Sequence, residues 1–180
     1  MDTIVCCKCW GNRFDLGFLD FVVFLMFNWC VVVISVAIGV VNLYNANVRK
    51  VKVMGLAPIG CTPHYLWQYQ SKNGECVKEI NHMINEFNFA MRYMVQELNQ
   101  ELAHANFIFY DAFEASMEIM KSLQNYGYEV TTDACCEMGP YHGWVIRISP
   151  DLACLNASND LWWDQFRPTD AMNSILADNV

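Results

Sequence analysis

The chain has 180 residues, with 11 Lys and Arg against 19 Asp and Glu, which gives a formal charge of −8. Hydrophobic residues make up 54% and charged residues 17%, which excludes a disordered chain and suffices for one packed core. No Lys/Arg-rich run appears. Because binding to a phosphate backbone needs such positive charge, we do not expect a nucleic acid partner.

An apolar run, Phe21–Val41, comes first in chain order, and its only clearly polar side chains are Asn28 and Ser35. As a helix, the run would extend over about 31 Å, the thickness of the hydrocarbon core of a bilayer. It is also typical of a long signal peptide, and a buried pair of β-branched strands is a third interpretation. We expect a membrane or targeting segment, and with it an association with membranes.

After this run the pattern becomes that of an α/β domain. Valines alternate with basic residues over Val48–Val53, which predicts a strand that ends at the Gly- and Pro-rich loop 55–63. Apolar residues in steps of three and four then predict a long amphipathic helix over 77–102. Its apolar stripe is Val77, Ile80, Ile84, Phe87, Met91, Met94, Leu98 and Leu102. Its outward side chains are expected to be Lys78, Asn81, Asn85, Arg92, Gln96 and Asn99.

In the second half of the domain, a strand is again followed by a helix. The apolar run Phe107–Tyr110 predicts a buried strand, and a second helix is expected from about Ala112 to Leu123. A turn-rich stretch follows over Asn125–Asn159, and a last helix is expected to begin at Pro168. Strands that alternate with helices imply a parallel sheet with helical crossovers.

The cysteines indicate an oxidising compartment. Four precede the domain, and five lie within it: Cys61, Cys76, Cys135, Cys136 and Cys154. A disulfide between Cys61 and Cys76 would close a short loop and stabilise the fold by about 3 kcal/mol. Asn156 begins an N-glycosylation sequon. The one C-x-x-C pair, Cys6 and Cys9, has no second such pair to complete a structural zinc site, and we expect neither a metal nor another cofactor.

Several segments carry a family resemblance. They are NLYNANVRKVKVMGLAPIGCTP, GEC before a helix that contains NEFN, ANFIFYDAFEASMEIM, TTDACCEMGPYHGW, SPDLACLNAS and LWWDQFRPTDAMNSILADN. In this order they resemble the C-terminal portion of plant GDSL-type esterase/lipases, of the SGNH hydrolase superfamily. The resemblance covers residues 42–180. We therefore expect residues 1–41 to be a segment foreign to the family and 42–180 to be part of its hydrolase domain.

The resemblance implies a three-layer, flavodoxin-like α/β fold, here incomplete, behind an N-terminal hydrophobic helix. It also implies hydrolysis of carboxylic esters of lipids or other acyl compounds by a Ser-His-Asp triad, in the secretory pathway or at the cell surface. The family's Asp and His share a D-x-x-H motif. Asp164 matches the Asp, and Arg167 stands at the position of the His.

The departures from the family decide the functional prediction. Arg stays protonated, so Arg167 cannot accept a proton from a serine, and an ion pair with Asp164 is expected instead. No G-D-S or G-x-S-x-G motif occurs in the chain. The four histidines, His64, His82, His104 and His142, are expected to be surface or packing residues. Arg147 stands where the family usually has a Cys, which leaves the pairing of Cys135, Cys136 and Cys154 open.

The sequence therefore predicts a GDSL-like ester hydrolase domain that is catalytically incomplete. One alternative is a truncated module that binds acyl groups or regulates a partner, through Trp162, Trp163 and Phe166. The competing role for those three aromatic residues is core packing. Another alternative is a small membrane-anchored protein whose main property is the apolar run Phe21–Val41.

Overall fold

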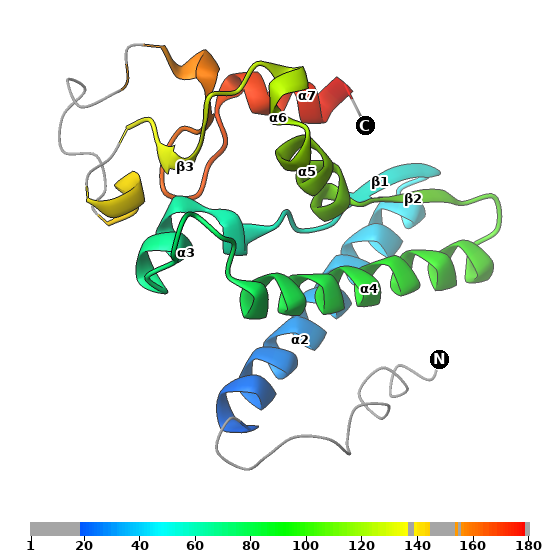
Figure 1. Ribbon diagram of the computed structural model, residues 1–180. Coiled ribbons are helices and arrows are strands. Elements are labelled where there is room, and N and C mark those ends of the chain that lie inside the picture. The colour runs from blue at the N-terminus through cyan, green and yellow to red at the C-terminus, as the bar shows by residue number, and fades with distance from the viewer. Residues whose placement is uncertain (1–18, 137–138, 145–153, 155, 179–180) are drawn as a thin grey trace. The chain divides into compact units, whose positions relative to one another are not determined.

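The structure is a computed structural model that describes residues 19–136, 139–144, 154 and 156–178 (Figure 1). These residues form two compact units. One consists of residues up to Val53 together with Phe87–Phe109, and the other of Met54–Glu86 together with the chain from Tyr110 onward.

The apolar run of the N-terminal segment belongs to one long helix, α2 (Leu19–Asn45). The interpretation of this run as a pair of strands is therefore wrong. Val40 of α2 is buried, and Val33, Val36 and Ala37 pack beside it in the core of the first unit. Among the described residues, no helix is both long enough and apolar enough to cross a membrane, so the predicted membrane-spanning helix is not found.

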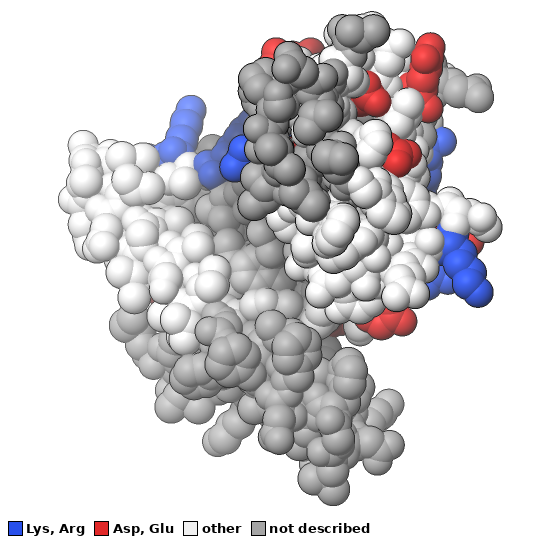
Figure 2. Space-filling view, turned by 90° about the vertical axis from the view of Figure 1, so that its left-hand side faces the viewer, with Lys and Arg blue, Asp and Glu red and all other residues white. Residues whose placement is uncertain are grey.

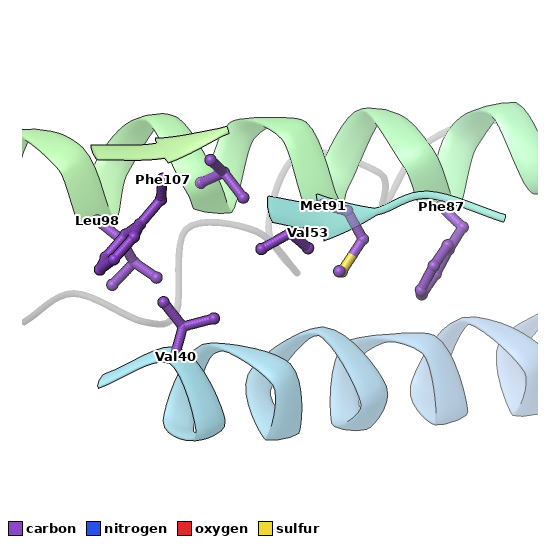
Figure 3. Packing of buried hydrophobic residues seen from close by; sticks show 7 residues of the cluster. Val40, Val53, Phe87, Met91, Leu98 and Phe107 are labelled. Atoms are coloured by element: carbon purple, nitrogen blue, oxygen red, sulfur yellow. The ribbon is translucent and has the colours of Figure 1, made fainter. Parts of the chain in front are cut away.

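The core of the first unit lies between α2, α4 (Lys78–Glu101) and two strands, β1 (Lys50–Met54) and β2 (Asn106–Tyr110). Figure 3 shows the side chains that meet there. The buried members are Val40, Val53, Phe87, Met91, Val95, Leu98 and Phe107. The helix and both strands lie close to the bounds that hydrophobic periodicity predicts, because burial of one face is what stabilises them.

The two strands β1 and β2 are neighbours in one sheet. The Asn106 N–H donates to the Arg49 carbonyl at the start of the pair, and the Gly55 N–H donates to the Tyr110 carbonyl at its end. The strands therefore run in the same direction, as the alternation of strands and helices predicts.

Asn99 of α4 is not on the outward face that the sequence predicts. Its side-chain amide donates to the Phe107 carbonyl at 2.7 Å and accepts from the Phe107 N–H at 2.8 Å. This pair of hydrogen bonds ties α4 to β2 within the first unit.

The second unit contains the other two strands, β3 (Val130–Ala134) and β4 (Asp160–Trp162), which pair in parallel. Around them lie α3 (Pro63–Gln68), α5 (Ala112–Lys121), α6 (Leu123–Tyr126), α7 (Asp170–Asp178) and three short 3₁₀ helices: η1 (Ile59–Cys61), η2 (Pro140–His142) and η4 (Ala157–Asn159). Its core consists of Cys61, Ile119, Tyr128, Ala134, Leu161, Trp162 and Met172. The mixed α/β fold class is confirmed.

Two local predictions for this unit are wrong. The stretch Asn125–Asn159 contains a strand, β3, which its turn-rich composition conceals. The last helix, α7, begins at Asp170 instead of Pro168. Pro168 forms a bridge with Trp162, and the hydroxyl of the buried Thr169 accepts from the Met172 N–H at 3.4 Å, as an N-cap residue does.

Asn81 is a third correction, because the sequence predicts it on the outer face of α4 and it is buried. Its Oδ1 accepts from the Gly60 N–H at 2.9 Å, and its Nδ2 donates to Cys61 Sγ at 3.2 Å. A Cβ on residue 60 would lie 2.6 Å from Asn81 Oδ1, so this contact requires glycine.

Candidate active site

The loop after β4 is a tight turn organised by Asp164. Its Oδ1 accepts two backbone hydrogen bonds, from the Phe166 N–H at 2.9 Å and from the Arg167 N–H at 2.7 Å. The Trp163 N–H donates to the Arg167 carbonyl at 2.8 Å, which closes the turn from the other side. A short acidic side chain that accepts from the next backbone N–H groups is the usual way in which Asp stabilises such a turn.

Arg167 forms an ion pair with the same carboxylate. Its Nη1 lies 3.3 Å from Asp164 Oδ2. The Arg167 side chain is 81% exposed, whereas that of Asp164 is only 18% exposed. The guanidinium therefore covers a carboxylate that is mostly shielded from solvent, and the predicted ion pair is present.

The turn lies against the start of α3. The His64 N–H donates to the carbonyl of the buried Gln165 at 3.3 Å. The His64 ring lies 4.7 Å from the Phe166 ring, centroid to centroid, and its Nδ1 is buried without a hydrogen-bond partner. His64 and Asp164 are 100 residues apart in the chain, so no local sequence signal could associate them.

The other three histidines lie elsewhere. His82 is exposed and lies 4.0 Å from Glu86 on the same helix, and His104 is exposed at the end of α4. His142 Nδ1 lies 2.7 Å from the Ala134 carbonyl oxygen. Their surroundings agree with the surface and packing roles that the sequence predicts.

The described serines differ in their surroundings. The hydroxyls of Ser35, Ser71 and Ser174 each donate to a backbone carbonyl, and Ser116 is buried on α5. Among the described serines, none is hydrogen-bonded to a histidine ring. Ser149 lies outside the described residues. A serine triad needs that contact between hydroxyl and imidazole.

Of the three aromatic residues near the turn, only one is well exposed. Trp162 is buried, and its Nε1 donates to the Thr131 carbonyl at 3.0 Å, so the core-packing role is correct for it. Phe166 is 50% exposed. Behind it lies a small cavity of about 70 Å³, which Phe166 lines together with Met120, Leu161 and other mostly apolar residues.

Two disulfides hold this unit. Cys61 pairs with Cys76, as the sequence predicts, and Cys135 pairs with Cys154, which resolves the pairing that the sequence leaves open. Cys136 is buried outside both bonds. Arg147, which stands where the family usually has a Cys, lies outside the described residues.

One group of side chains has the spacing of metal ligands. The sulfur atoms of Cys135 and Cys154 and a carboxylate oxygen of Asp160 lie within 4.8 Å of one another. Because the two sulfurs are joined in a disulfide, they offer no thiolate, and the group is not a metal site in this redox state.

Comparison with known proteins agrees with these features. A family model described as GDSL-like Lipase/Acylhydrolase matches residues 33–180 and thus begins within the apolar run. Two GDSL esterase/lipases from Arabidopsis thaliana are 32% and 34% identical to this chain over 136 and 137 residues, which are 76% of the chain and 36% and 39% of the relatives. GDSL esterase/lipase 7 of the same plant is 31% identical over 140 residues, which are 77% of the chain and 38% of that protein.

The chain thus spans less than two fifths of the length of these relatives. The family model nevertheless covers most of the chain, and the fold is of the mixed α/β class that the resemblance implies. The chain is a member of the GDSL-like lipase/acylhydrolase family.

Proposed function

We propose that this chain contains the carboxylate loop of a GDSL-type ester hydrolase and that its 180 residues do not hydrolyse esters by themselves. In the reaction of the family, an imidazole takes the proton of the serine nucleophile while an Asp orients that imidazole. Asp164 would be this Asp. Arg167, at the position of the imidazole, is a permanent cation with five donors and no acceptor.

The ion pair between Asp164 and Arg167 carries this proposal. Asp164 already accepts two backbone hydrogen bonds through Oδ1, and Arg167 lies beside Oδ2. Both carboxylate oxygens therefore have partners within the turn. A carboxylate arranged in this way stabilises a loop, and none of the described histidines is hydrogen-bonded to it.

Binding of an acyl chain is less well supported. Trp162 is buried with its indole N–H already bonded. The apolar cavity beside Phe166 has a volume of only about 70 Å³, far below the ~300–1,000 Å³ of ordinary ligand sites.

An oxidising compartment, such as the secretory pathway, is the location that we propose. The disulfides Cys61–Cys76 and Cys135–Cys154 support it, because disulfides persist mainly in secreted and extracellular proteins. Mass spectrometry of native material for these two bonds and for a glycan on Asn156 tests the location.

Ester turnover tests the proposal on function. The purified, disulfide-bonded chain is assayed with p-nitrophenyl butyrate and p-nitrophenyl dodecanoate, beside its Arg167→His variant. We expect both proteins to match a blank without protein, because restoring an imidazole does not supply a nucleophile. Turnover by either protein that a fluorophosphonate abolishes would contradict the proposal.

A further inference from the structure

Another cavity of the second unit is lined by no residue of the Asp164 turn and has no assigned role. Its volume is about 580 Å³, within the range of small-ligand sites. Its lining comes from α3 and the turn after it, from β3 and from η2. The lining residues are Leu66, Trp67, Gln68, Gln70, Ser71, Asp133, Pro140 and Tyr141.

Most of these side chains bear polar groups without a positive charge. Gln68 and Gln70 offer amide donors and acceptors, Ser71 and Tyr141 offer hydroxyl oxygens, and Asp133 offers a carboxylate. Among the described residues that line the cavity there is no Lys, Arg or His. Asp133 and the net charge of −8 oppose an anionic ligand.

Two indole rings lie close together where Trp67 lines this cavity. Trp67 lines the cavity, and its ring lies 6.3 Å from that of Trp144, with an angle of 31° between the planes. Trp144 is 60% exposed. Figure 2 looks onto the side of the molecule where α3 lies in Figure 1, and wide uncharged areas cover much of this face. Trp67 is half-buried and Trp144 is exposed, and their indole rings offer apolar surface to a ligand that also needs hydrogen bonds.

The surrounding loops are fixed in place. The Tyr141 hydroxyl donates to the Ser71 carbonyl at 3.0 Å and accepts from the Gly74 N–H at 3.1 Å. A Cβ on Gly139 would lie 2.9 Å from Trp144 Cβ, so Trp144 packs directly over this glycine. Thr132 Oγ1 donates to Asp133 Oδ2 at 2.9 Å, which orients the carboxylate, and Oδ1 is the oxygen that we expect a ligand to reach. The site therefore exists before a ligand binds, which lowers the entropic cost of binding.

We infer that this cavity binds a neutral carbohydrate. A pyranose ring with equatorial hydroxyls has C–H groups on both faces, which stack on an indole, and a rim of hydroxyls, which pair with amides and carboxylates. The Trp67 ring, with Trp144 beside it, offers apolar surface for the faces, and Gln68, Gln70 and Asp133 match the rim. A β-1,4-linked glucose chain presents this chemistry repeatedly.

Two other ligand classes fit less well. A quaternary ammonium ion favours a closed box of aromatic faces, whereas the only aromatic residues among the described lining of the cavity are Trp67 and Tyr141. A fatty acyl chain would leave the amides and the carboxylate of the wall without partners, which costs free energy.

Calorimetric titration of the full disulfide-bonded chain with cellotetraose tests this inference, and it does not depend on ester hydrolysis. We expect saturable binding that weakens by about tenfold or more in Trp67→Ala and in Asp133→Asn, because each removes one part of the recognition. Trp67→Phe keeps the packing of α3 and should show a smaller loss. Phe89→Ala removes an aromatic side chain that is 70% exposed on α4 and should bind as the parent does.

Three results would overturn the inference. One is the absence of cellotetraose binding by protein whose circular dichroism shows it to be folded. Another is equal weakening in Phe89→Ala, which would mean unspecific binding. The third is binding of dodecanoate or choline, but not of cellotetraose, in a manner that Trp67→Ala abolishes.

Discussion

Asp164 and Arg167 are joined twice, through the backbone and through their side chains. The Arg167 N–H donates to Asp164 Oδ1 at 2.7 Å, and the Arg167 guanidinium lies 3.3 Å from Asp164 Oδ2. The backbone contact is the one that shapes the turn, since it would persist with another side chain at position 167.

Substitutions of these two residues should therefore lower the free energy of unfolding by different amounts. Asp164→Ala removes the acceptor of two backbone hydrogen bonds and is expected to lower the free energy of unfolding by about 1–3 kcal/mol. Arg167→Ala removes an ion pair whose guanidinium is well exposed to solvent and should cost less than about 1 kcal/mol. Urea unfolding of the two variants measures the difference. Equal losses would mean that the ion pair, and not the backbone contact, holds the turn.

Residue 60 has no room for a side chain, whereas residue 39 does. A Cβ on Gly60 would lie 2.6 Å from both Asn81 Oδ1 and the Val77 carbonyl oxygen, but a Cβ on Gly39 has nothing within 4 Å. Gly60→Ala is expected to lower the midpoint of thermal unfolding. Gly39→Ala, within α2, should raise the stability by up to about 1 kcal/mol through helix propensity. A Gly60→Ala protein as stable as the parent would show that the loop moves aside freely.

The disulfide Cys61–Cys76 closes a loop with a sequence separation of 15. Replacement of both cysteines by Ala should lower the free energy of unfolding by about 3 kcal/mol, mainly because the unfolded chain gains freedom. Urea unfolding without reductant measures the loss. With a dithiol reductant present, which reduces both disulfides, the parent and the double variant should unfold at similar urea midpoints. An unchanged midpoint of the double variant without reductant would contradict the assignment.

Asp160 should make stability depend on pH. Burial raises the pKa of its carboxyl group above the ordinary value of 3.8, and the neighbouring Asp133 and Glu129 raise it further. The folded protein thus holds this proton more tightly than the unfolded chain, so stability falls as the pH rises through the window from 3.8 to the raised pKa. Asp160→Asn is expected to raise the melting temperature at pH 7 and to leave it nearly unchanged at pH 3.5. A variant with the same advantage at both pH values would contradict this cause.

The sequence predicts well those elements that bury one face. α4, β1 and β2 lie close to their predicted bounds because hydrophobic periodicity reflects burial directly. The sequence predicts poorly which polar side chains are buried, because these form hydrogen bonds with specific distant partners. The helical pattern predicts Asn81 and Asn99 on the surface. In the structure each side-chain amide is hydrogen-bonded to backbone groups that come close to it only when the chain folds.

The candidate site, too, has one part that the sequence predicts and another that it does not. The Asp164–Arg167 pair lies within four residues and is evident from the sequence. The contact of His64 with Phe166 joins residues about a hundred positions apart, and the cavity beside Trp67 combines α3, β3 and η2. Strand β3 was missed altogether, so the wall that carries Asp133 could not be predicted.

The most direct test of the proposed function is intact-mass analysis of the purified chain after incubation with a fluorophosphonate that labels activated serines. A labelled GDSL-type esterase serves as the positive control. We expect the chain to keep its unmodified mass, both as the parent and as Arg167→His. A single adduct on one serine of the folded parent, lost on denaturation before labelling, would show an activated nucleophile and contradict the proposal.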